Sequence, residues 1–148
     1  MIRVDQTLFG VGTGNCFAAC IACFAEVPIA EVPNFCCLEG DWYAECNRWL
    51  IQRGFRIGFW EMELPGFVHE MRRLNPNRDF YWIAGGTCPP RKSNPGGPHV
   101  CVYLNDRLWH DPNPERTGLI KTDCAFLVNR DPVKQPRDPQ WLAGHICP

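Results

Sequence analysis

A glycine-rich run followed directly by an apolar stretch constrains how the first part of this chain can fold. Residues 10–15 read Gly-Val-Gly-Thr-Gly-Asn, and residues 16–24 read Cys-Phe-Ala-Ala-Cys-Ile-Ala-Cys-Phe. Glycines permit a tight loop, and apolar residues at helical spacing predict a buried helix. The boundary places Cys16 in the first helical turn, where unpaired backbone N–H groups and the helix dipole favour a thiolate.

The 148 residues are enough for one domain with a core and too few for two. We therefore expect a single domain over residues 1–148, with the proline-punctuated tail at 130–148 on its periphery. A hydrophobic content of 45% indicates a folded globule. With 15 basic and 16 acidic residues and no basic cluster, the sequence argues against nucleic acid or a membrane surface as a partner.

The first residues, Met-Ile-Arg-Val-Asp-Gln, lack the basic and apolar regions of a signal peptide. No apolar stretch is long enough to span a membrane. We therefore expect a cytoplasmic protein. In that compartment the ten cysteines are expected to be reduced thiols rather than a disulfide framework.

Helical patterns dominate the first third of the chain and strand patterns the rest. Apolar spacing predicts helices at 16–24, 41–53 and 66–74, with Asp41 as a cap and Gly54 as a stop for the second. Alternating and β-branched runs predict strands at 55–61, 79–84, 99–104, 107–111 and 125–129. Asn105-Asp106 is a predicted hairpin turn, and residues 85–98, rich in proline and glycine, are a predicted loop. This order predicts an α+β domain.

Four histidines are candidates for a base beside the thiol. His69 is expected at the surface, and His145 lies in the tail. His110 directly precedes a candidate carboxylate on a strand, and it therefore points away from the site that the carboxylate faces. His99 begins a strand just after the Pro-Gly-Gly-Pro run at 95–98. We therefore predict that His99 is the base.

A carboxylate is predicted beside this histidine. If the hairpin turns at 105–106, residue 99 pairs with about residue 112, so Asp111 falls close to the His99 ring, allowing for a bulge. A carboxylate in that position fixes the tautomer of the imidazole. Asn113 is the alternative orienting residue, because an amide can do the same.

An oxyanion needs hydrogen-bond donors near the nucleophile. The backbone N–H of Cys16 is available at the helix start. Gln6 and Asn15 are the candidate side-chain donors, and capping of the helix is the other possible role of Asn15. Trp82, Trp109 and the proline-rich loop are expected to wall the cleft.

Several short motifs, in order along the chain, resemble the papain-like cysteine peptidase superfamily. They are Gln6, Gly-Asn-Cys-Phe-Ala-Ala-Cys at 14–20, His-Val-Cys-Val-Tyr at 99–103 and His-Asp-Pro-Asn-Pro at 110–114. The likeness is greatest to the compact bacterial branch that includes double-glycine leader peptidases, and to small phage and bacterial proteins with Gly-Asn-Cys-Phe and His-Asp-Pro motifs.

This resemblance implies a papain-like α+β fold, with the nucleophile at the start of the first helix and the helices packed on an antiparallel sheet. It also implies Cys16 as nucleophile, His99 as base, Asp111 as orienting residue and a glutamine as oxyanion donor. Two departures stand out. The family's glutamine usually lies nearer to the cysteine than Gln6 does, and the residue after the cysteine is often Gly, whereas here it is Phe17.

The expected function is that of a cysteine hydrolase or acyl-transfer enzyme acting on a peptide, isopeptide or other amide, with a peptide or protein substrate and no metal or organic cofactor. One alternative is a non-catalytic binding or inhibitor module, such as a phage protein, that retains this fold. Another is a metal-binding protein that uses Cys16, Cys20 and Cys23, spaced as in iron–sulfur motifs, or zinc on Cys36, Cys37 and Cys46. Helical spacing instead places Cys20 and Cys23 in the core.

Overall fold

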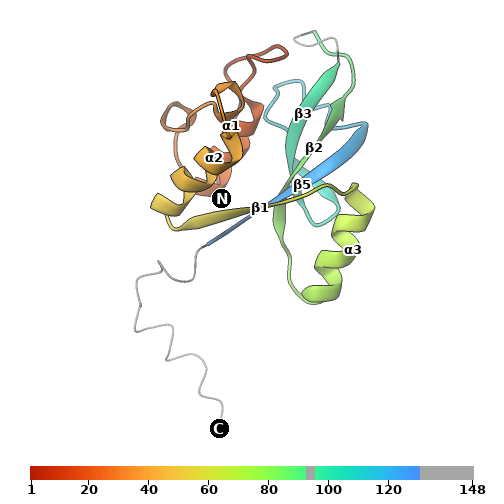
Figure 1. The fold of residues 1–148 in the computed structure, drawn as a ribbon. Helices are drawn as coiled ribbons and strands as arrows, with labels where there is room; N and C mark the ends of the chain where they lie inside the picture. Colours follow the sequence, from red (N-terminus) through yellow and green to blue (C-terminus); the bar gives the residue numbers. More distant parts are fainter. Residues whose placement is uncertain (93–95, 131–148) are drawn as a thin grey trace.

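The predicted helical segments form helices close to the expected bounds. The computed structural model describes residues 1–92 and 96–130, and the predictions for the tail and for His145 therefore lie outside the described residues. Within these residues the α-helices are α1 (Cys16–Ala25), α2 (Trp42–Gln52) and α3 (Leu64–Leu74), with short 3₁₀ turns at Ile29–Glu31 and Phe35–Cys37. The α+β class is confirmed (Figure 1).

Local signals explain where the helices begin and end. The carboxylate of Asp41 accepts the backbone N–H of Ala44 at 2.9 Å and caps α2, as predicted. Gly54 follows α2 with a φ of 78°, in the left-handed region that glycine adopts readily. Helix α3 begins two residues before the predicted start, because Pro65 lies in its first turn, where proline is favoured.

The strands form one antiparallel sheet in the order β1-β5-β2-β3-β4. Their bounds are Phe55–Trp60 for β1, Tyr81–Cys88 for β2, Gly97–Leu104 for β3, Arg107–His110 for β4 and Lys121–Arg130 for β5. The hairpin between β3 and β4 turns at Asn105-Asp106 as predicted, and Asn105 has the positive φ that such a turn requires.

Two strands are longer than the sequence pattern indicates. Strand β2 continues through Gly85 and Gly86 to Cys88, and β3 begins at Gly97, so residues 85–88 and 97–98 of the predicted loop belong to strands. Gly86 pairs with β5, and glycine is required at this position because a Cβ would lie 1.9 Å from the carbonyl oxygen of Lys121. Strand β5 likewise begins at Lys121 rather than at residue 125.

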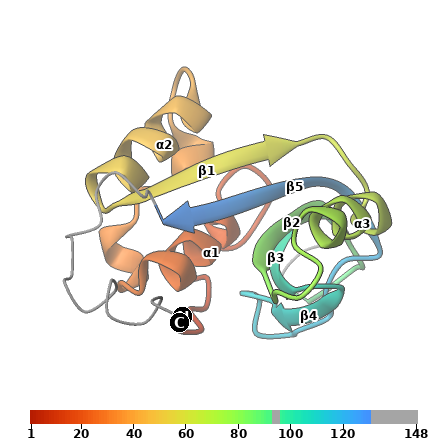
Figure 2. The same cartoon turned by 90° about the horizontal axis from the view of Figure 1, so that it is seen from below.

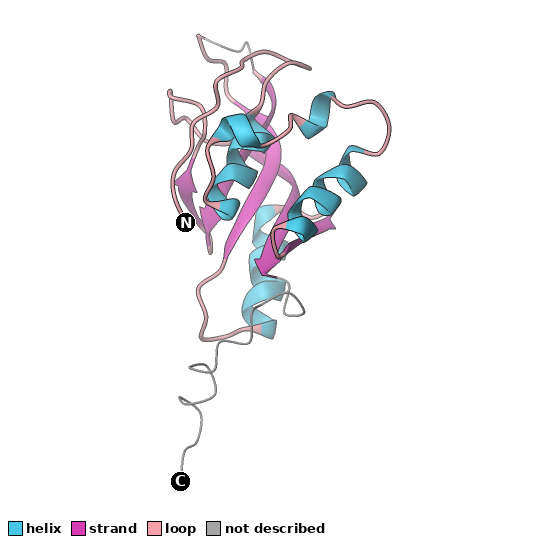
Figure 3. Ribbon diagram, turned by 90° about the vertical axis from the view of Figure 1, so that its left-hand side faces the viewer, coloured by secondary structure: helices cyan, strands magenta, loops and turns pink. Residues whose placement is uncertain are grey.

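Helices cover both faces of this sheet. Helices α1 and α2 pack on one face, over a core that includes Phe17, Ile21, Leu50, Ile83 and Phe126. Helix α3 packs on the other, over a second cluster that includes Trp82 and Tyr103. Figure 2 shows β1 and β5 lengthwise while β2, β3 and β4 lie almost end-on beside α3, so the sheet is strongly twisted. Figure 3 shows helices on both sides of the strands.

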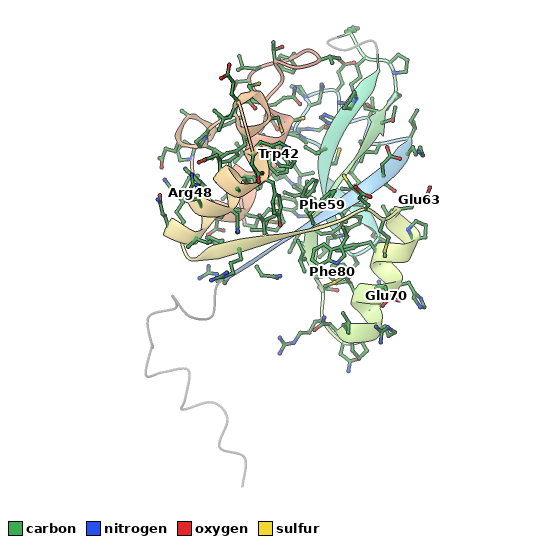
Figure 4. All side chains as sticks on the ribbon, in the orientation of Figure 1. Trp42, Arg48, Phe59, Glu63, Glu70 and Phe80 are labelled. Carbon is green, nitrogen blue, oxygen red and sulfur yellow. The ribbon has the colours of Figure 1, made fainter. Side chains whose placement is uncertain are left out.

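Aromatic side chains fill the space between the layers. Figure 4 labels Trp42 on α2, Phe59 on β1 and Phe80 just before β2. The rings of Trp42 and Phe59 both contact Phe126, and Phe80 packs against Phe67 of α3. These contacts join each helical layer to the sheet.

Cysteine side chains are mostly internal. Cys20 and Cys23 of α1 are fully buried, as their helical spacing predicted. The nine cysteines in the described part of the chain are free thiols, so no disulfide joins any two of them. No helix in residues 1–92 and 96–130 is long and apolar enough to cross a membrane.

Candidate active site

A closed glycine loop delivers Cys16 to the start of α1. The backbone N–H of Gly14 donates to the carbonyl of Gly10 at 2.9 Å, and that of Asn15 donates to the carbonyl of Leu8 at 3.3 Å. A Cβ on Gly14 would lie only 2.9 Å from the Gly10 oxygen, so glycine is required for the loop to close. Cys16 then opens the helix with a half-buried side chain.

His99 of β3 and Asp111, directly after β4, are in contact. Nε2 of His99 lies 2.7 Å from Oδ1 of Asp111, and both side chains are almost completely buried. The ladder between β3 and β4 has an irregularity between Val102 and Tyr103, which is the kind of register shift that the predicted hairpin allowed for. The predicted contact between these two side chains is therefore confirmed.

His99 also contacts the thiol. Both residues line one cleft, and the interaction with Cys16 raises the pKa of the ring; Nδ1 is the ring nitrogen free to face the thiol because Nε2 faces Asp111. Burial lowers the pKa of His99, but the hydrogen bonds to Asp111 and Cys16 outweigh burial and the net pKa is raised. The imidazolium form is thus favoured between a carboxylate and a thiol.

The carboxylate of Asp111 is fully engaged by donors. Oδ1 accepts from His99 and from the backbone N–H of Asn113 at 2.8 Å. Oδ2 accepts from Nη2 of Arg91 at 2.7 Å and from the backbone N–H of Gly118 at 2.8 Å. Burial raises the pKa of Asp111, but the hydrogen bonds from His99, Asn113 and Gly118 outweigh it and lower the pKa to about 2.

Arg91 is a residue of this site that sequence reasoning missed. It lies just beyond β2, in the segment predicted as a loop on composition alone, yet its side chain is buried against Asp111. Its Nε also donates to Oγ1 of Thr117 at 2.6 Å, and Nη2 donates to the carbonyl of Gly118 at 2.9 Å. The only sequence signal was an arginine inside a proline- and glycine-rich segment, which is not specific.

Gln6 reaches the start of α1 despite its distance from Cys16 along the chain. Its backbone N–H donates to the carbonyl of Pro112 at 2.9 Å, and its side-chain Nε2 donates to the carbonyl of Leu8 at 3.0 Å. The same Leu8 carbonyl accepts the N–H of Asn15, so the Gln6 amide lies near the Gly14–Asn15 peptide, one residue before Cys16. The side chain of Gln6 is buried.

Asn15 and Asn113 have other tasks than those considered from the sequence. The side-chain oxygen of Asn15 accepts the N–H groups of Thr7 and Leu8 at 3.0 and 2.9 Å, which holds the N-terminal arm, and this side chain does not cap α1. The side-chain oxygen of Asn113 accepts the N–H of Glu115 at 3.0 Å within a turn. The carboxylate that holds His99 is thus Asp111.

A cleft of about 290 Å³ opens at the thiol and the imidazole. The side chains of Phe17, Trp42, Val100 and Phe126 give it apolar walls, and Cys36, Cys37 and the glycine loop line it as well. A larger cavity, of about 410 Å³, lies next to α3, and none of the candidate residues lines it. The candidate site is therefore assigned to the smaller cleft, which Cys16 and His99 line.

Two tryptophans do not line this cleft, contrary to expectation. Trp82 is fully buried on the α3 side of the sheet, where its indole N–H donates to the carbonyl of Asn105 at 2.7 Å. Trp109 lines a separate cavity of about 260 Å³. The prediction rested on their aromatic character, but Trp82 packs in the core and Trp109 faces another cavity. Of the predicted loop, Pro98 does line the cleft.

The other histidines in the described residues lie away from the thiol. His69 is exposed on α3, as predicted. His110 is buried, and its Nε2 lies 2.9 Å from the carbonyl oxygen of Val4 on the N-terminal arm. Strand alternation therefore separates His110 from Asp111 as expected.

One group of potential metal ligands occurs in the described residues. Donor atoms of His99, Cys101 and Asp111 lie within 4.8 Å of one another, and all three side chains are buried. The oxygens of Asp111 are already occupied by four donors, and burial raises the pKa of Cys101 far above its ordinary value, which disfavours the thiolate that a metal requires. Two cysteines of the iron–sulfur alternative lie apart from this group: the thiol of Cys20 contacts the carbonyl of Val100, and that of Cys23 contacts the carbonyl of Val4.

Comparison with known proteins gave no relatives. No family model matches the sequence, no curated protein matches it, and no solved structure matches the fold. What the protein does must therefore be argued from the geometry of its own residues.

Proposed function

We propose that this protein is a papain-like cysteine hydrolase or acyl-transfer enzyme that acts on a peptide, isopeptide or other amide bond. The observation that carries the proposal is the position of His99, whose ring contacts the Cys16 thiol on one side and the Asp111 carboxylate on the other. A nucleophile, a base within hydrogen-bond reach and a group that orients the base are the parts that covalent catalysis by a thiol requires. The arrangement of a helix-borne cysteine against a sheet-borne histidine also supports the papain-like assignment.

In the proposed reaction the Cys16 thiol gives its proton to His99, and the thiolate attacks the carbonyl carbon of the substrate. The C–N bond then breaks as the His99 imidazolium donates a proton to the leaving amine, and an acyl-enzyme remains. His99 next takes a proton from water, or from an amine in a transfer reaction, as that nucleophile attacks the thioester. The acid or new amide leaves and the thiol is restored.

Two donors are candidates for the oxyanion of this reaction. The first is the backbone N–H of Cys16 at the positive end of α1. The second is the side-chain amide of Gln6, which has two N–H groups and uses one of them on Leu8. Gln6 is preferred to Asn15 because the Asn15 side chain already holds the arm.

Alkylation of the native protein tests the proposal. With limiting iodoacetamide at pH 6 and peptide mass mapping, we expect Cys16 to be modified well before the other cysteines. In the proposed function His99 acts as the base for Cys16, whereas desolvation raises the pKa of Cys36 to about 11, although part of that residue reaches solvent.

Cys36 is the matched control because it lines the same cleft. If Cys16 reacts no faster than Cys36 between pH 5 and 9, the hydrolase proposal is wrong. The non-catalytic binding module then becomes the better explanation of the fold.

The apolar cleft predicts which substrates are preferred. None of the described residues that line it is Asp, Glu, Lys or Arg. Peptides with an aromatic or branched aliphatic residue next to the scissile amide should therefore have a kcat/KM at least about tenfold above those with Lys or Glu there, since apolar contacts of this size are worth roughly 1–3 kcal/mol. Trp42→Ala should narrow this difference, and equal rates for charged and apolar peptides would refute the prediction.

A further inference from the structure

Arg91 has a charged side chain that is buried in the described part of the chain. Its guanidinium is buried, although arginine is rarely buried unless it is paired. The partner is Asp111, and the side chains of both are at most 1% exposed. Burial of two charges in contact costs much of what their attraction provides, so such a pair is weak support for a purely stabilising role.

The contacts of Arg91 hold one carboxylate oxygen in place. Nη2 lies between Oδ2 of Asp111 and the carbonyl of Gly118, while the N–H of Gly118 donates to the same Oδ2. Nε is held by Thr117. The carboxylate is thus gripped on its far side, which leaves Oδ1 to face His99.

The hydrogen bonds of the Arg91 guanidinium are incomplete. Among the described residues, Nη1 of Arg91 is buried and has no hydrogen-bond partner. An unpaired buried donor is costly. A smaller neutral side chain could donate to Oδ2 of Asp111 without burying an unpaired N–H group. What a neutral donor lacks is a fixed positive charge behind the carboxylate.

We propose that Arg91 is a positioning residue of the site: it fixes the Asp111 carboxylate toward His99, and its charge limits how strongly that carboxylate holds the imidazolium. This inference rests on the proposed function. The titratable and charged groups that face His99 are Cys16 from α1, Cys101 from β3 and Asp111 after β4, with Arg91 behind Asp111. Arg91 is the cationic group in this set other than His99 itself.

Direct titration of His99 by NMR tests the role of the charge. In Arg91→Met, His99 becomes the sole cationic partner of a buried carboxylate, so we expect its pKa to rise by about one unit or more. Arg91→Lys keeps the charge and should give a His99 pKa close to that of the native protein, but a slower Cys16 alkylation because the planar fork to Thr117 and Gly118 is lost. Arg48→Met is the matched control, because Arg48 is an exposed arginine on α2 that pairs with Glu45 of the same helix, and it should leave the pKa unchanged.

Each outcome bears on the inference. Circular dichroism and a urea titration identify the variants that remain folded, and the Lys variant serves if the Met variant does not fold. An unchanged or lowered His99 pKa in folded Arg91→Met, or a His99 pKa in Arg91→Lys that departs from the native value, would overturn the role assigned to the charge. Because His99 is titrated directly, this result is independent of whether Cys16 proves reactive, which is the test of the proposed function.

Discussion

Replacement of His99 by alanine is expected to slow the alkylation of Cys16 at pH 6 by about 100-fold or more, in line with the contribution of a positioned base. In the proposed function the ring is the partner of the thiol, and its raised pKa favours the imidazolium form at this pH. At pH 9 the difference should shrink, because ordinary thiols are largely ionised at that pH without a neighbouring base. The measurement is the rate of iodoacetamide incorporation at Cys16 from pH 5 to 9.

His69→Ala is the matched control for this variant. His69 is exposed on α3, on the other side of the sheet from Cys16, and its removal should leave the rate within about twofold. Equal rates for the native protein and His99→Ala at pH 6 would show that the thiol is not activated by this histidine.

Asp111→Asn is expected to lower the free energy of unfolding by about 3–5 kcal/mol, the usual cost of breaking a buried ion pair from one side. The variant leaves Arg91 buried without a counter-ion. It also places an amide N–H₂, a donor, among groups that are themselves donors, so that its hydrogens have no acceptor. Urea denaturation measures the loss. Addition of Arg91→Met to the variant should recover part of it, because the uncompensated charge is then gone.

The exposed pair of Glu70 and Arg73 on α3 is the control for Asp111→Asn. Glu70→Gln should cost no more than about 1 kcal/mol, as surface pairs do. A loss of that small size for Asp111→Asn would contradict the assignment of a buried, fully engaged carboxylate.

The same carboxylate predicts a dependence of stability on pH. The pKa of Asp111 is about 2 in the folded protein, below its value of about 3.9 in an unfolded chain. Its contribution is therefore complete above pH 4 and is lost as the pH falls toward 2, by roughly 2–3 kcal/mol. Asp111→Asn should lack this part of the pH dependence, which urea titrations at pH 5 and pH 2.5 would reveal.

The helix-start position of Cys16 and the contact of His99 with Asp111 could be predicted from sequence because each lies at an element boundary with strong local signals. The glycine run fixes where α1 begins, and the hairpin turn at Asn105-Asp106 sets the register that brings Asp111 to His99. Both inferences use residues close to each other in the chain or in adjacent strands.

Features that depend on contacts between distant segments could not be predicted. Gly85 and Gly86 are typical of a loop, and only the close approach of the Lys121 backbone makes glycine necessary there within a strand. Arg91 pairs with a carboxylate twenty positions along the chain. The composition of the segment that contains Arg91 does not indicate which residues it contacts. Trp82 was expected at the cleft, but its side chain lies on the other face of the sheet.

The N-terminal arm spans the junction between the helical layer and the sheet. The N–H of Val4 donates to the thiol of Cys23 on α1, while its carbonyl meets His110 at the end of β4. Gln6 continues the link to Pro112, next to Asp111. Cys16 belongs to the helical layer and His99 to the sheet, and the arm bonds to both layers. Under the proposed function, the alignment of the thiol with the imidazole therefore depends on how the two layers are fastened together.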